Sequence, residues 1–398
     1  MKKLMLATSA VAMMASGAYA AGHAEEVKIG VVLGFTGPLE SITPAMGAGA
    51  ELAMAEVTAS GALLGGATVT SVRGDSTCID AGAATAAAER LVTSDAVDAI
   101  MGADCSGVTG AILQNVARPN GVVMISPSAT SPGLSTAEDD GLFFRTAPSD
   151  ARQGVIITEI LQDRGVTEVA LTYTNNDYGK GLADAFQAAF EEAGGTVTIS
   201  AAHEDGKADY SAEVGALASA GGEVLVVAGY VDQGGSGIIR SSLDSGAFDT
   251  FYLPDGMVGA VLNDNFGAEL NGSFGAYPGT DNAGAGIFVE LAAEAGFDGT
   301  GAFAPESYDA AALIMLAMQA AGSKDPADYK EHVFDVANAP GIEILPGDLA
   351  RGLELIAAGE DIDYVGASAV ELIGPGESAG SYQEIEFVDG VYSTINFR

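Results

Sequence analysis

Six hydroxyl- or carboxylate-bearing residues follow short apolar runs that we predict to be strands, and such strand ends are the usual place of ligand sites in open α/β sheets. Ser106 also opens a predicted helix, so its hydroxyl and the adjacent backbone N–H groups can receive an anion. Asp255 suits an ammonium group. An anion site opposite a cation partner is what a zwitterionic amino acid needs. The six residues are Ser106, Ser128, Thr130, Tyr178, Tyr230 and Asp255.

Each of these residues also has a plainer structural interpretation. A serine at a helix start can simply cap the helix, and serine and threonine often form turns. A tyrosine can be a half-buried packing residue, and an aspartate can belong to a turn. Their joint position at predicted strand ends favours the binding interpretation.

Catalytic motifs give no competing assignment. His23, His203 and His332 lie far apart in the sequence, and no HExxH, P-loop or dinucleotide-binding motif is present. The stretch Gly376–Gly380 matches G-x-S-x-G, but a nucleophile elbow needs an aspartate and then a histidine after the serine, and no histidine follows Ser378. We therefore predict no catalytic residues, no metal and no cofactor.

The elements that must hold the six residues alternate between strand and helix. A first series has strands at 27–34, 67–74, 97–101 and 122–125. A second has strands at 168–174, 196–201, 224–228 and 250–253. Helices fit between them at a spacing typical of parallel, doubly wound sheets. The fold class is therefore α/β.

Three extended stretches predict crossings between two lobes: Phe143–Asp150, Phe274–Gly279 and Val370–Gly376. Such a three-segment hinge can absorb the angle change of lobe closure. We assign residues 25–146 plus 279–372 to lobe 1, and residues 147–278 plus 373–398 to lobe 2. Tyr382–Val388 and Val391–Phe397 predict a terminal hairpin on lobe 2.

Residues 1–20 are typical of a secretory signal peptide. Lys2 and Lys3 precede the apolar run Leu4–Ala15, which is too short to span a bilayer, and Ala18-Tyr19-Ala20 forms a cleavage site. The chain has 16 basic and 54 acidic residues and a formal net charge of −38. This charge repels nucleic acid and anionic membrane surfaces, so we expect neither as a partner.

Cys78 and Cys105 are the two cysteines of the sequence. In the oxidising compartment that a signal peptide implies, we predict that they form a disulfide bond. Metal binding by two isolated cysteines with no neighbouring histidine is disfavoured.

Short motifs spread from Val27 to the C-terminus carry a resemblance to a known family. They are GFTGPL (34–39), the cysteine pair, Asp104-Cys105-Ser106, ISPSATSP (125–132), FFRTAPSD (143–150), NNDYGKG (175–181), Gly229-Tyr230 and LPDG (253–256). Through them the chain resembles the periplasmic leucine/isoleucine/valine-binding proteins of ABC transporters. The resemblance implies the type I periplasmic-binding fold, a periplasmic location, and a monomer that delivers an amino acid to a membrane permease.

By position, the resemblance also implies roles for single residues. Ser106 and Thr130 would hold the ligand carboxylate, while the backbone at Ser128 would help to hold the ammonium and Ala129 would lie between them in the binding loop. Tyr178 and Tyr230 would close over the ligand from lobe 2. Asp255 stands where leucine-type members usually have Glu as the charge partner of the ammonium, and its shorter side chain demands a closer lobe or a bridging water.

Asp104 departs from the family pattern, in which this position is apolar and touches the ligand side chain. Glu40 and Ile42 lie in the loop that we expect to line the same pocket. Because a buried carboxylate facing an aliphatic group is costly, Asp104 makes a polar or cationic ligand side chain plausible. The alternative is that Asp104 points away and bonds to the backbone.

Three hypotheses follow. The leading one is an exported solute-binding protein that captures a branched-chain or related amino acid between its lobes. The second is a sensor or receptor subunit of the same fold that binds an amide, a small carboxylate or a polar or cationic amino acid. The third is an enzyme, which the missing nucleophile and base argue against.

Overall fold

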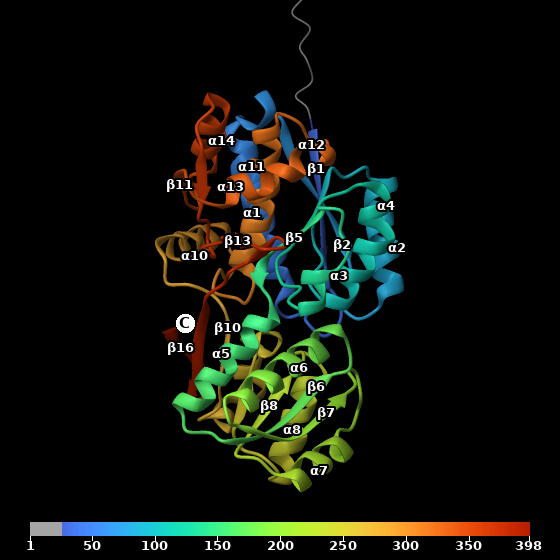
Figure 1. The fold of residues 1–398 in the computed structure, drawn as a ribbon, viewed down its shortest axis with the longest axis vertical. Coiled ribbons are helices and arrows are strands. Elements are labelled where there is room, and N and C mark those ends of the chain that lie inside the picture. The colour runs from blue at the N-terminus through green and yellow to red at the C-terminus, as the bar shows by residue number, and fades with distance from the viewer. Residues whose placement is uncertain (1–25) are drawn as a thin grey trace, which may run out of the picture.

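The computed structural model describes residues 26–398, and the predicted signal peptide lies outside the described residues. Two lobes stack along the long axis of the molecule, each built on a seven-stranded sheet with helices packed against it (Figure 1). Most neighbouring strands run parallel, which confirms the predicted α/β class. Within the described residues, no helix combines the length and hydrophobicity that crossing a membrane requires.

The sheet of lobe 1 has the strand order β13-β14-β5-β4-β3-β1-β2. Its inner strands form because they are short apolar runs that can be buried on both faces, as parallel sheets require. In β1, for example, the consecutive residues Val31, Val32 and Leu33 point to alternate faces and are all fully buried. The bounds are β1 Glu26–Leu33, β2 Thr68–Asp75, β3 Ala99–Gly102, β4 Met124–Ser126, β5 Phe143–Pro148, β13 Leu372–Ile373 and β14 Glu377–Ser378.

Helices α1 and α11 of lobe 1 pack closely against each other. A Cβ atom on Gly49 of α1 would lie 2.6 Å from the carbonyl oxygen of Ala304, so a larger residue would push the start of α11 away. The helices of this lobe are α1 Thr43–Ser60, α2 Ala81–Thr93, α3 Ser106–Ile112, α4 Arg118–Asn120, α10 Ala283–Ala295, α11 Ala304–Ala321, α12 Pro326–Tyr329, α13 Val333–Ala337 and α14 Leu349–Ala358. A separate parallel pair, β11 Ile342–Ile344 and β12 Ile362–Tyr364, flanks α14.

The sheet of lobe 2 has the order β16-β15-β10-β9-β8-β6-β7. Strand β15 pairs antiparallel with both β10 and β16, which confirms the predicted terminal hairpin. The strands are β6 Glu168–Thr174, β7 Thr196–His203, β8 Val224–Ala228, β9 Phe251–Leu253, β10 Phe274–Pro278, β15 Tyr382–Val388 and β16 Val391–Phe397. The helices are α5 Asp150–Asp163, α6 Asp177–Glu192, α7 Ser211–Ala220, α8 Gly234–Ser245 and α9 Val261–Phe266.

The chain passes between the sheets three times, after β5, after β10 and after β14. The first and third crossings come later than the boundaries expected after residues 146 and 372. The reason is that Ser378 of β14 pairs with Pro148 of β5, so the returning chain first completes the sheet of lobe 1. A strand of two residues leaves no periodic pattern in the sequence, and the residues before it, Gly374, Pro375 and Gly376, resemble a simple turn.

Candidate functional site

A narrow cavity lies between the lobes, at the carboxyl ends of their parallel strands. Lobe 1 lines it with Leu39, Asp104, Cys105, Ser106, Ser128 and Phe303, and lobe 2 lines it with Tyr178, Tyr230, Asp255 and Gly256. The structure therefore brings five of the six residues predicted from strand ends into one cavity. The sixth, Thr130, lies with Ala129 in the loop that carries Ser128, and both are buried.

Residues 126–132, here called the clamp loop, are tied to the loop that precedes α3. The backbone N–H of Ser131 donates to Ser106 Oγ at 3.1 Å. Ser128 Oγ donates to the carbonyl oxygen of Asp104 at 3.0 Å, and Ser126 Oγ accepts the N–H of Ala129 at 2.9 Å. These bonds hold the hydroxyl groups of Ser106 and Ser128 at the cavity wall.

Thr130 differs from the other hydroxyl residues of the clamp loop. Its carbonyl oxygen accepts the N–H of Asp150 at 2.8 Å, so the backbone is fixed. Its Oγ1 is buried and has no hydrogen-bond partner. The hydroxyl lies beside the Asp150 carboxyl, whose pKa it lowers. Thr130 can therefore donate to that carboxyl or to a ligand group.

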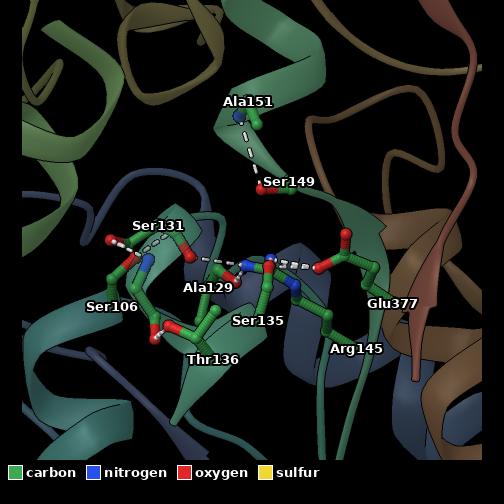
Figure 2. Close-up of polar contacts among 10 residues, drawn as sticks. Ser106, Ala129, Ser131, Ser135, Thr136, Arg145, Ser149, Ala151 and Glu377 are labelled. Atoms are coloured by element: carbon green, nitrogen blue, oxygen red, sulfur yellow. Dashed lines mark hydrogen bonds and ion pairs between the residues drawn. The ribbon is translucent and has the colours of Figure 1, made fainter. Parts of the chain in front are cut away.

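Arg145 is the residue that holds the clamp loop in place, and it comes from β5 (Figure 2). Its guanidinium donates to the carbonyl oxygens of Ala129 and Ser131 at 2.7 and 3.0 Å. The other end of the same fork forms an ion pair with Glu377 Oε2 at 2.6 Å, and the Arg145 side chain is 1% exposed. The motif FFRTAPSD pointed to this strand, but nothing in the sequence assigned Arg145 a role.

On lobe 2, the two predicted tyrosines stack on each other, with ring centroids 5.2 Å apart. Tyr178 also donates from its hydroxyl to Asp255 Oδ1 at 2.5 Å, and the N–H of Gly256 donates to the same oxygen at 2.7 Å. Tyr178 reaches this position because a glycine follows it: a Cβ on Gly179 would lie 2.1 Å from the carbonyl oxygen of Thr174. Tyr178, Tyr230 and Asp255 are therefore buried in contact with one another.

A second buried carboxylate, Asp150, lies near Asp255 and was not predicted. Burial raises the pKa of both carboxyl groups, and the Asp255 charge raises the pKa of Asp150 further. Neither oxygen of Asp150 has a hydrogen-bond partner, and Gln153, one turn further along α5, has none for its amide. The Thr130 hydroxyl lies close enough to Asp150, and the Gln153 side chain close enough to Asp255, to lower the pKa of each carboxyl group, although burial outweighs both effects. The lobe junction thus holds two buried carboxyl groups side by side.

Asp104 lines the cavity, but both of its oxygens are used within lobe 1. Oδ2 accepts the N–H of Gly34 at 2.8 Å, and Oδ1 accepts the hydroxyl of Ser76 at 2.8 Å. Burial raises the pKa of Asp104, while these two bonds lower it. Of the second interpretation above, the bond to the backbone is present, at Gly34, but Asp104 still lines the cavity and does not point away from it.

The loop with Glu40 and Ile42 reaches the cavity through Leu39 instead. Glu40 is exposed, and Ile42 is buried against lobe 2, where a Cβ on Gly259 would lie 3.3 Å from its Cγ2. The same loop also bonds directly to the other lobe. Asp232 accepts the N–H of Ser41 at 2.8 Å and donates its own N–H to the carbonyl oxygen of Pro38 at 3.1 Å.

Cys78 and Cys105 are joined in a disulfide bond beside the cavity. The bond ties the end of β2 to the loop before α3. In the described part of the chain, one group of three or more potential metal ligands lies close together, and it consists of these two cysteines with Asp104. Since both sulfur atoms are taken by the disulfide, this group is not a metal site.

Comparison with known proteins assigns the chain to a family. The sequence model of the periplasmic binding protein family matches residues 26–342. The Leu/Ile/Val-binding protein homolog 1 of Brucella melitensis is 31% identical over 326 residues, which cover 80% of this chain and 85% of that protein. Homolog 3 of the same organism is 32% identical over 228 residues, which cover 57% of this chain and 61% of that protein.

The fold has a solved counterpart in the leucine-binding protein LivK of Thermotoga maritima. The two structures superpose with a TM-score of 0.79 at 22% sequence identity, covering 93% of this chain and 98% of that one. At this identity the likeness concerns the fold.

Proposed function

Because the chain belongs to the periplasmic binding protein family, we propose that it captures an aliphatic amino acid between its lobes and delivers it to an ABC permease. We place this activity in the periplasm and assign it to a monomer without enzymatic activity. The two Brucella relatives are named for leucine, isoleucine and valine, which is consistent with this ligand class.

One observation supports the proposal: the wall of a single cavity that lobe 1 forms carries serine hydroxyls, and the wall that lobe 2 forms carries a buried carboxyl group, Asp255, which makes hydrogen bonds but no ion pair within the described residues. Ser106 and Ser128 line the lobe 1 wall, and the Thr130 hydroxyl, unpartnered, lies in the same loop. Asp255 lines the lobe 2 wall. The hydroxyls of Ser106 and Thr130 suit a carboxylate, and the carboxylate of Asp255 suits an ammonium group.

The remaining walls support an aliphatic side chain. They are formed by the apolar or aromatic groups of Leu39, Phe303 and Tyr230, and the disulfide sulfur of Cys105. Asp104 is satisfied by Gly34 and Ser76, so it does not require a cationic partner from the ligand.

Ligand binding would favour the closed arrangement, because the anion and cation partners lie on different lobes. A ligand shifts a conformational equilibrium only through its differential affinity for the two states. An amino acid meets both walls only when the lobes are closed. This coupling gives a permease a means of distinguishing the loaded protein.

A thermal-shift panel on the mature chain tests the proposal. We expect aliphatic α-amino acids to raise the unfolding midpoint, since a ligand at one hundred times its dissociation constant adds about 2.7 kcal/mol to the free energy of unfolding. Basic, acidic and aromatic amino acids, simple amides and short carboxylates serve as comparisons. If no α-amino acid shifts the midpoint, the proposal is wrong.

A further inference from the structure

A second cavity, here called the hinge pocket, is lined by residues that follow β10, where the chain crosses between the lobes, and by the start of α11. The crossing that follows β10 can be traced in Figure 1. Its volume is about 490 Å³, within the range of small-molecule sites. Lobe 2 contributes Tyr277 and Gln383, and lobe 1 contributes Asn282, Glu306 and Ser368. None of the residues that line it lines the ligand cavity.

Glu306 is the central polar group of the hinge pocket. It is 1% exposed, and its Oε2 has no hydrogen-bond partner. Its backbone is fixed, because the Thr146 hydroxyl of β5 donates to its carbonyl oxygen at 2.8 Å. Burial raises the pKa of Glu306 to about 8, with a smaller contribution from the charge of Asp309.

Asp309, one turn later on α11, differs from Glu306, whose Oε2 has no hydrogen-bond partner. Asp309 accepts hydrogen bonds from the hydroxyls of Tyr364 and Ser368 at 2.7 and 2.6 Å, and from the N–H of Ala367 at 2.8 Å. The fold thus satisfies one buried carboxylate of this helix completely. A carboxylate that lines a cavity without such bonds calls for a partner in the cavity.

The other polar groups of the hinge pocket indicate what that partner is. Its charged lining consists of Glu306, Asp281 and Glu290, and the lining includes no lysine, arginine or histidine. The side-chain amide nitrogen of Asn282 is buried and has no acceptor, while its oxygen caps α10 by accepting the N–H of Ala285 at 2.9 Å. The pocket therefore offers negative charge for a cation and one free donor for an oxygen.

We propose that the hinge pocket binds a small organic cation whose ammonium group pairs with Glu306 and whose oxygen accepts a hydrogen bond from Asn282. Because residues of both lobes line the pocket, its occupant contacts both sides of the hinge and stabilises one angle between them. The pocket is thereby a second, regulatory site. This assignment is independent of which solute the cavity between the lobes takes.

Two amino alcohols, ethanolamine and 5-aminopentan-1-ol, are suitable probes, with ethylene glycol and pentane-1,5-diol as uncharged counterparts at equal ionic strength. Binding to the full mature chain is measured by calorimetry and by saturation-transfer NMR. We expect at least one amino alcohol to bind, and its diol counterpart to bind at least tenfold more weakly.

Three variants locate the binding. Glu306→Gln should weaken it at least tenfold, and it should fold, since a carboxyl with a pKa of about 8 is largely protonated at neutral pH. Glu290→Gln removes the same charge from the exposed rim and should change affinity less than threefold. Asp255→Ala, which disables the cavity between the lobes, should leave probe binding unchanged.

Affinity for the amino alcohol should also rise roughly fivefold to tenfold between pH 7 and 8.5, because the cation pairs with ionised Glu306. The other titratable groups around Glu306 do not explain such a rise. Asp309 has a pKa of about 6, and burial raises the pKa of Tyr277 far above this range. The Glu306→Gln variant should show no such rise.

The proposal is overturned if neither amino alcohol binds at 10 mM, or if Glu306→Gln binds as tightly as the wild type. It is also overturned if Asp255→Ala abolishes binding while Glu306→Gln retains it, since the probe would then occupy the cavity between the lobes. None of these results bears on whether an amino acid binds in that cavity.

Discussion

Replacing Arg145 with alanine is expected to lower the free energy of unfolding by about 3–5 kcal/mol, the usual cost of removing one partner of a buried ion pair. The Glu377 side chain, which is only 15% exposed, would lose the guanidinium that lies 2.6 Å from its Oε2. The carbonyl oxygens of Ala129 and Ser131 would lose their donor as well. Denaturant unfolding of the unliganded protein measures this loss.

The same variant should weaken amino-acid binding, because Arg145 fixes the clamp loop that carries Ser128 and Thr130. Arg73→Ala is a matched control: Arg73 also forms a short ion pair, with Glu51 at 2.7 Å, but its side chain is 45% exposed. Exposed pairs contribute about 0–1 kcal/mol. If Arg145→Ala destabilises the protein no more than Arg73→Ala, the positioning role of Arg145 is wrong.

Asp255→Ala is expected to weaken amino-acid binding by at least about tenfold, a loss of about 1.4 kcal/mol or more. The variant removes the carboxylate that we pair with the ligand ammonium, and it also frees the Tyr178 hydroxyl. Asp177→Ala is the control. Asp177 directly precedes Tyr178 in α6 and is exposed, so this variant removes a carboxylate near the site without removing one from the cavity wall. Calorimetric titration of both variants with the same amino acid measures the difference.

The affinity should also fall on acidification. Ammonium binding requires ionised Asp255, and burial raises the pKa of this group in the unliganded protein. Protonation therefore competes with the ligand at a higher pH than an ordinary aspartate would cause. If Asp255→Ala binds with the affinity of the wild type, Asp255 does not belong to the site.

The residues that sequence patterns could identify are those at strand ends. Ser106, Ser128, Tyr178, Tyr230 and Asp255 follow apolar runs, and parallel strands bring such positions together whatever the details of packing. The alternation of strand and helix and the terminal hairpin were predictable for the same reason, because they depend on local patterns.

The residues that were missed depend on contacts between distant segments. Arg145 acts through Glu377, which belongs to a two-residue strand and lies 232 positions later in the sequence. Asp150 matters because it begins α5 beside Asp255, which follows β9 about one hundred residues later in the same lobe. The orientation of Asp104 is set by Gly34 and Ser76, which lie at or just after the ends of two different strands. No local pattern encodes these pairings.

The central claim is that the cavity between the lobes recognises the ammonium and carboxylate groups of one amino acid together. Its most direct test is calorimetric titration of the mature chain with the aliphatic amino acid that gives the largest thermal shift, and with its two analogues that lack either the ammonium or the carboxylate. We predict that each analogue binds at least about tenfold more weakly than the amino acid. Equal affinity for the analogue without the ammonium, or no binding of any α-amino acid, would contradict the account.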